Sequence, residues 1–209
     1  MRHTIAIEVA GIRLIVPDMF TPVGSGTDDP LRLTTYSAQT GQGVAMLEAR
    51  PIEESGAMPF GDGRRVVDDA HAELTDTQGL VEVGLGATHA GHDAIWRIVK
   101  ATEPDQTLGH HLTYQLTMDV RFDDTILELT VAAEEAGMAG VREKYVRDHA
   151  KRHHHIDKDG NGWAADPYDP TITSGVLRDL SDDIAWDARF PDHPLSMIRR
   201  TVLTVMNHD

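Results

Sequence analysis

The sequence predicts an α+β fold in which helices flank an antiparallel sheet. The main observation is a run from Leu112 to Phe122 in which apolar side chains occupy every second position. This period of two is typical of an antiparallel strand with one face on a core and the other in water. Helical spacing occurs elsewhere, chiefly in residues 64–74 and 141–152. A chain of 209 residues also buries about 70% of its surface, which suffices for one core.

The N-terminal part contains three short β-type runs. Residues 12–17 (IRLIVP) form an apolar run that ends with a proline, and residues 21–30 have the composition of a loop. Residues 31–38 and 44–52 are further β-type runs separated by the sequence QTGQG. A short glycine-containing connection of this kind predicts a β-hairpin.

A helix is predicted for residues 64–74, with Asp62 as its N-cap. The residues expected on its apolar face are Val66, Val67, Ala70, His71 and Leu74. A histidine on such a face is more often a half-buried, hydrogen-bonded side chain than a metal ligand. We expect the former for His71.

An antiparallel meander of four strands is predicted after this helix. Its first two strands are residues 80–85 and 94–100. The residues expected on one face of the first strand are Val81, Val83 and Leu85. The strand of Leu112 to Phe122 comes third, and a turn at Asp123-Asp124 leads into the fourth. The apolar positions of the fourth strand are Leu127, Leu129 and Val131.

The C-terminal part is predicted to be helices joined by a polar segment. Residues 141–152 are helical, and residues 153–175 form the polar segment. The inward positions expected on this helix are Val141, Tyr145 and His149. Arg142-Glu143 and the segment around Trp163 and Tyr168 are expected to lock the tail to a sheet edge, rather than to line a binding pocket.

Two further helix signals follow near the end of the chain. Ser181 is a predicted N-cap, with Asp182 and Asp183 favourably placed in the first turn. His193-Pro194 begins the last helix. The apolar stripe of that helix consists of Leu195, Ile198, Val202 and Val205.

The order of these elements resembles the Mog1/PsbP-like family, in which helices lie on both sides of a curved antiparallel sheet. The resemblance covers residues 5–135 and is carried by the run IRLIVP, the hairpin around Gly41, the helix of residues 64–74 and the meander of residues 80–131. Members of such folds mostly act as binding or accessory proteins, and the resemblance implies this for the present chain.

The tail resembles that of uncharacterised bacterial proteins of unknown function. The residues that carry this resemblance are Gly162-Trp163, Asp166-Pro167-Tyr168-Asp169-Pro170, Asp179-Leu180-Ser181 and the stretch from Phe190 to Ser196. We predict a single domain of residues 1–209. Within it, residues 1–135 are the sheet core with one helix, and residues 136–209 are a helical and loop extension packed on that core.

The composition excludes several classes of function. The formal charge is −15, and no basic stripe of the kind that nucleic-acid binding requires is evident. The chain has no cysteine, which excludes thiolate catalysis and Cys-ligated metals. No apolar stretch approaches the roughly 18 residues of a membrane span. The N-terminus lacks the features of a signal peptide, so the cytoplasm is the expected location.

The run from Asp157 to Gly162 (DKDGNG) is the most suggestive of a metal site. Alternating oxygen ligands around a glycine turn match the first half of an EF-hand loop, which makes Asp157, Asp159 and Asn161 the candidate ligands of a calcium ion. The position of the closing bidentate Glu is taken by Tyr168. A polar turn is therefore the alternative to a structural calcium loop at residues 157–161.

Histidines precede this run and suggest a second metal hypothesis. His149 and His153 are one helical turn apart, so they could bind a transition metal together with a third ligand such as Asp157. A metal-dependent hydrolase that uses residues 149–169 is the corresponding alternative function.

The favoured hypothesis is a non-catalytic cytoplasmic protein with a binding or accessory role. The sequence contains neither a G-x-S-x-G nucleophile elbow nor a phosphate-binding loop. A protein is the expected partner, whereas nucleic acid and membrane are not expected. The sequence does not determine the oligomeric state.

Overall fold

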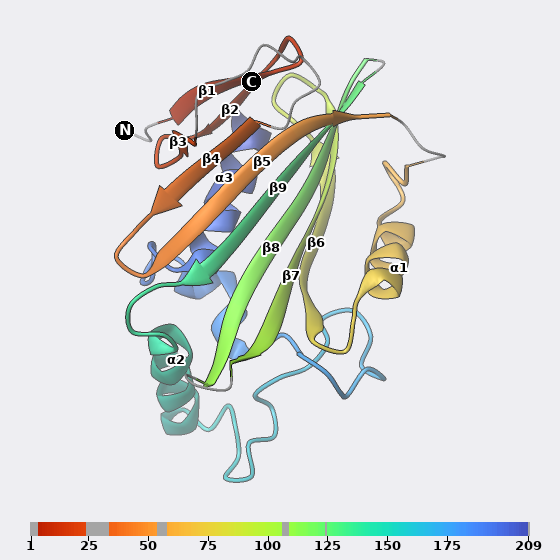
Figure 1. Cartoon of the computed structure of the whole chain (residues 1–209). Helices are drawn as coiled ribbons and strands as arrows, with labels where there is room; N and C mark the ends of the chain where they lie inside the picture. The colour runs from red at the N-terminus through yellow and green to blue at the C-terminus, as the bar shows by residue number, and fades with distance from the viewer. Residues whose placement is uncertain (1–3, 24–33, 54–57, 106–108, 124, 209) are drawn as a thin grey trace.

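A seven-stranded antiparallel sheet dominates the part of the chain that the structure describes (Figure 1). This structure is a computed structural model and describes residues 4–23, 34–53, 58–105, 109–123 and 125–208. The strands follow the order β3-β4-β5-β9-β8-β7-β6. Their bounds are Thr21–Pro22 (β3), Thr34–Gln39 (β4), Gly43–Ile52 (β5), Gln78–Ala87 (β6), Asp93–Asp105 (β7), Gly109–Phe122 (β8) and Thr125–Glu135 (β9). The predicted α+β class with an antiparallel sheet is confirmed.

A separate hairpin joins β1 (Thr4–Val9) to β2 (Ile12–Pro17). Its turn is Ala10-Gly11, and both residues have positive φ, which glycine adopts without strain. The sequence predicted β2 and missed β1. Only two side chains of β1, Ile7 and Val9, are buried, so its apolar signal is short.

One face of the sheet forms the hydrophobic core with α3 (Pro194–Asn207). Leu116 lies opposite both Ile98 and Val131 in the register, so that their side chains share this face. In Figure 1, α3 lies behind the sheet. The predicted stripe of α3 is buried, and His193 caps the helix ahead of Pro194, as predicted. The tail, residues 136–209, thus contributes α3 to the main core.

A β-bulge changes the predicted faces of β6. The register between β6 and β7 shifts between Leu80 and Glu82. Val81 is consequently buried in the core, whereas Val83 and Leu85 do not belong to it. The prediction that these three residues share one face was wrong, because an extra residue in a strand reverses the alternation beyond it.

The opposite face of the sheet carries α1 (Gly63–Glu73) beside β6 (Figure 1). Asp62 accepts a hydrogen bond from the backbone N–H of Arg65, so the predicted N-cap is confirmed. Val66 and Ala70 are buried against the sheet. This helix therefore covers the face beside β6 and does not extend over β4 and β5.

The helix α2 (Val141–Arg152) has its predicted bounds but a different buried face. Its buried residues are Arg142, Val146 and Ala150, and Val141 is exposed. The predicted inward face was wrong because Arg142 is buried on this helix, whereas the apolar Val141 beside it is exposed. Two short 3-10 helices follow, η1 (Leu180–Asp182) and η2 (Ile184–Trp186).

The predicted cap of the short helix near residue 181 was also wrong. Asp179, and not Ser181, caps η1, because its side chain accepts hydrogen bonds from both the backbone N–H and the hydroxyl of Ser181. In the described part of the chain, no helix is long and apolar enough to cross a lipid bilayer.

Candidate functional site

The face of the sheet opposite α3 contains a hollow beside its β4 edge. The hollow has a volume of about 750 Å³ and is bounded by β4, β5, β8 and β9. Its lining includes Ser37, Val44, Met46, Thr113, Ala132 and Glu134. Met46 is 46% exposed, which is unusual for a large apolar residue in the middle of a strand. In Figure 1 this face is turned toward the viewer.

The charges beside this hollow are mainly negative. Glu134 lines it, and Glu48 lies two residues beyond Met46 on the same strand face. Neither carboxylate forms an ion pair with a described residue. Arg50, which follows on that face, is held by Glu128: its Nε and a terminal nitrogen lie 2.7 and 2.6 Å from the same carboxylate oxygen. The hollow is therefore apolar with an acidic border.

A narrower cleft of about 280 Å³ lies under α1 on the same face. Asp69 and Glu73 approach it from the helix, and Arg97, Asp119 and Glu128 from the sheet. Arg97 bridges the two sides through a 2.6 Å ion pair with Glu73. The cleft thus combines several carboxylates with one arginine.

Asp119 is the unusual carboxyl of this cleft. Burial, followed by the negative charge of Glu128 directly opposite in the register, raises the pKa of Asp119 to about 6. Its Oδ1 is buried and has no hydrogen-bond partner within the described residues. A cationic group placed there would supply the missing partner and lower the pKa. The sequence alone does not single out Asp119, because its pairing with Glu128 depends on the register of two strands.

A second polar cluster is buried between the sheet and the tail. Lys100 lies 2.8 Å from Asp179 and 2.6 Å from Asp182, and the Tyr114 hydroxyl donates to Asp182. Burial opposes the charge of Lys100, but the two aspartates together raise its pKa. Burial and then Asp182 raise the pKa of Tyr114 well above its usual range. These groups bond to one another, as expected of a structural anchor.

Arg142 extends this cluster, but it joins parts of the tail to one another and not, as predicted, to a sheet edge. Its guanidinium donates to the backbone carbonyls of Ser181 and Asp183 and to the Ser196 hydroxyl, and it pairs with Asp187 at 2.9 Å. It thereby joins α2 to η1, to the loop after η2 and to α3. A buried charge is tolerated only with such full hydrogen bonding, which is why an arginine occupies this inward position.

His71 is half-buried and paired, as predicted. Its Nε2 lies 3.1 Å from the Asp166 carboxylate. The Tyr168 hydroxyl is 2.6 Å from the backbone nitrogen of Val83, so the loop of Trp163 to Pro170 is attached to both α1 and β6. The contact between His71 and Asp166 therefore attaches the tail to α1.

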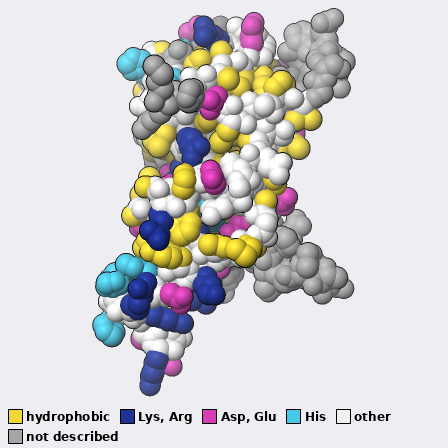
Figure 2. Space-filling view, turned by 90° about the vertical axis from the view of Figure 1, so that its left-hand side faces the viewer, with side chains coloured by type: hydrophobic (Ala, Val, Ile, Leu, Met, Phe, Trp, Pro, Cys, Tyr) yellow, Lys and Arg dark blue, Asp and Glu magenta, His cyan; other side chains and the backbone are white. Residues whose placement is uncertain are grey.

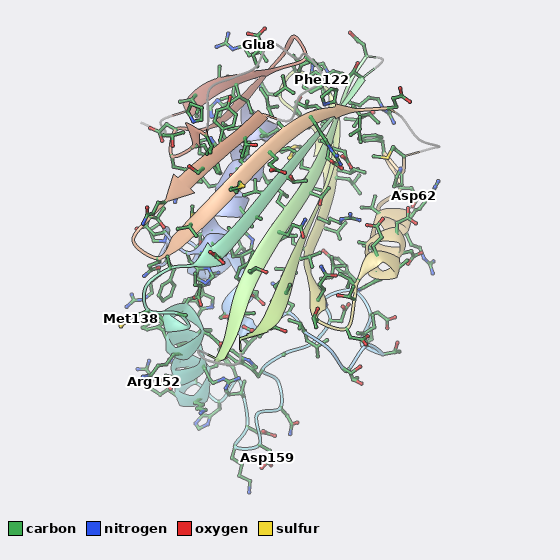
Figure 3. All side chains as sticks on the ribbon, in the orientation of Figure 1. Glu8, Asp62, Phe122, Met138, Arg152 and Asp159 are labelled. Carbon is green, nitrogen blue, oxygen red and sulfur yellow. The ribbon has the colours of Figure 1, made fainter. Side chains whose placement is uncertain are left out.

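The predicted calcium ligands Asp157, Asp159 and Asn161 lie in one loop at the end of the molecule, where Figure 3 labels Asp159. Asp157 accepts hydrogen bonds from the backbone N–H groups of Asp159 and Asn161 and from the Asn161 side chain, at 2.7 to 2.9 Å. The bonds with Asn161 are the main reason that the pKa of Asp157 is lowered. These bonds close the loop as a polar turn, and the calcium site stays a prediction.

The histidines of the proposed hydrolase site are close to one another. The ring centres of His149 and His153 are 4.3 Å apart, and those of His153 and His155 are 6.1 Å apart. Across the described ranges, however, no three His, Asp or Glu residues are arranged to hold a metal ion. The metal-dependent hydrolase therefore gains no support from the geometry.

Comparisons with known proteins found no matching family model and no matching curated protein. Among solved structures, the Saccharomyces cerevisiae Ran-binding protein Mog1p is 10% identical, with 99% of this chain and 97% of that chain covered and a TM-score of 0.45. A mutant of Mog1 is also 10% identical (98% and 97% covered, TM-score 0.43).

A protein of unknown function from Pseudomonas aeruginosa is 14% identical, with 74% of this chain and 96% of that chain covered and a TM-score of 0.37. Two of these three structures are of Mog1 proteins.

Proposed function

We propose that this chain is a non-catalytic binding protein whose hollow sheet face receives an amphipathic, cationic segment of a protein partner. The observation that carries this proposal is the apolar hollow around the exposed Met46, which Glu134 lines and near which Glu48 lies two residues along the same strand. Location in the cytoplasm and a single-domain organisation remain predictions from the sequence.

The chemistry of the hollow supports a partner with apolar and positively charged groups. Exposed apolar patches with a polar border mark interaction sites, and methionine adapts its shape to different partners. The carboxylates beside the hollow and in the cleft under α1 complement cations, and electrostatic complementarity directs partner choice. The net charge of −15 also attracts cationic partners over longer distances.

The buried ionisable groups support binding rather than catalysis. Lys100, Asp182 and Arg142 use their hydrogen-bonding groups within the chain. Lys100 and Asp182 join the sheet to the tail, and Arg142 joins parts of the tail to one another.

The test is the binding of a fluorescent amphipathic peptide built of lysine and leucine, measured by anisotropy. We expect Met46→Arg to weaken binding by about tenfold, which corresponds to about 1.4 kcal/mol. The matched control is Met138→Arg, which adds the same charge at a position that is 83% exposed and outside the hollow. Equal affinities of the two variants would show that the peptide does not use this face.

A further inference from the structure

Positive charge is concentrated at one end of this acidic molecule. Residues 141–158 contain 6 of the 19 lysines and arginines and 3 of the 34 acidic residues. The segment therefore carries 6 − 3 = +3, and the remaining chain carries 13 − 31 = −18. Figure 2 shows Lys, Arg and His side chains gathered at the lower end of the molecule, where Figure 1 places α2.

The exposed side of α2 bears a basic stripe, which consists of Lys144, Arg147 and Lys151. These residues are three and four positions apart, so they project from the same side of the helix. Lys144 and Lys151 form no ion pair with any residue in the described ranges. The guanidinium of Arg147 lies 4.6 Å from the ring centre of Trp163, which fixes its position beside the two lysines. The stripe is not evident in the sequence, because Asp148 and apolar residues separate these cations in the chain.

The stability of the helix does not account for the whole stripe. Cations in the last turn, such as Lys151, interact favourably with the helix dipole. Lys144 is the fourth residue of α2, near the positive end of the dipole, where a cation is unfavourable. An external anion would offset this unfavourable placement.

The surroundings of the stripe are also positive. Partial desolvation, followed by the positive charges of His153, Arg152 and His155, holds the pKa of His149 below its usual value. Two carboxylates of α2 flank the stripe: Glu143 lies 3.6 Å from Arg147, and Asp148 is four residues from Lys144 and three from Lys151. Charge at this end of the molecule therefore favours an anionic ligand.

We infer that the basic stripe of α2 is a docking surface for a short acidic segment of a protein. The 12 residues of α2 span about 18 Å at 1.5 Å per residue. A long polyanion such as nucleic acid would extend beyond this length and meet the −18 charge of the remaining chain. A short acidic segment matches the stripe in both charge and length. This surface is separate from the hollow face and would take a partner of opposite charge.

The test uses a fluorescein-labelled, glutamate-rich peptide of about twelve residues at low salt. We expect the double variant Lys144→Glu/Lys151→Glu to weaken binding by about tenfold or more. The matched control is Arg64→Glu/Arg65→Glu on the exposed side of α1, which changes the net charge by the same amount. Its affinity should remain within about threefold of that of the unchanged protein.

Three outcomes would overturn the inference. Equal losses in both double variants would indicate a general effect of net charge. Tighter binding of a deoxythymidine oligonucleotide than of the peptide, lost on reversing Lys144 and Lys151, would assign the stripe to nucleic acid. Self-association of the unchanged protein in sedimentation, lost in the same variant, would make a second copy of the chain the occupant.

Discussion

The raised pKa of a single side chain, Asp119, makes the stability of the fold depend on pH. Asp119 is half-buried beside Glu128, and desolvation together with the charge of Glu128 raises its pKa from 3.8 to about 6. Because the pKa is higher in the folded state, the ionised form destabilises the fold above about pH 6. This penalty disappears as the pH falls from about 6 to 3.8.

Asp119→Asn should therefore stabilise the protein near neutral pH. We expect a gain of about 1–3 kcal/mol in the free energy of unfolding near pH 7.5, since one pKa unit corresponds to about 1.4 kcal/mol. Near pH 4.5 the gain should fall to about half or less. Urea unfolding at both pH values measures the effect, with the exposed Glu134→Gln as a control. An equal gain at both pH values would mean that the ionisation of Asp119 does not destabilise the folded state.

The attachment of the tail to β6 depends on a close approach of two backbones. The carbonyl oxygen of Val176 would lie 1.4 Å from a Cβ placed on Gly79, so no side chain fits there. Gly79→Ala should cost about 1–3 kcal/mol of stability and loosen the segment around Val176, because overpacking displaces the backbone. Limited proteolysis and urea unfolding measure both effects. Gly41→Ala is the control, since a Cβ on Gly41 meets no atom within 4 Å.

The loop from Asp157 to Asn161 is predicted to be either a calcium site or a polar turn, and the two alternatives differ in their response to calcium. A calcium site requires that calcium raise the melting temperature by several degrees, because a ligand that binds only the folded state stabilises it. The hydrogen bonds of Asp157 within the loop favour the polar turn, so we expect a shift below about 1 °C at millimolar calcium. Differential scanning fluorimetry of metal-stripped protein decides the question. Asp157→Ala, which removes the central carboxylate, must abolish any shift that is due to this loop.

At the scale of the whole molecule, two surfaces of opposite charge lie on different elements. The hollow face lies on β4, β5, β8 and β9, and the basic stripe lies on α2. The Debye length is about 8 Å at physiological salt, so charges on the two surfaces that are farther apart than this are largely screened from each other. We expect Met46→Arg to leave the affinity for the glutamate-rich peptide within about twofold. The affinity of the Lys144→Glu/Lys151→Glu variant for the lysine-leucine peptide should likewise remain within about twofold. If each variant instead lost affinity for both peptides, the two peptides would share one surface.

The sequence by itself determined the α+β class and most of the elements, because hydrophobic periodicity and caps are local properties of the chain. The alternation of Leu112 to Phe122 predicted β8, and Asp62 and His193-Pro194 marked the starts of α1 and α3. The tertiary structure alone decided which residues meet. The bulge in β6, the burial of Arg142 and the pairing of Asp119 with Glu128 depend on register and on partners remote in the chain. A hollow around Met46 or a charged cleft arises only when several strands align, since no local pattern encodes the distance between them.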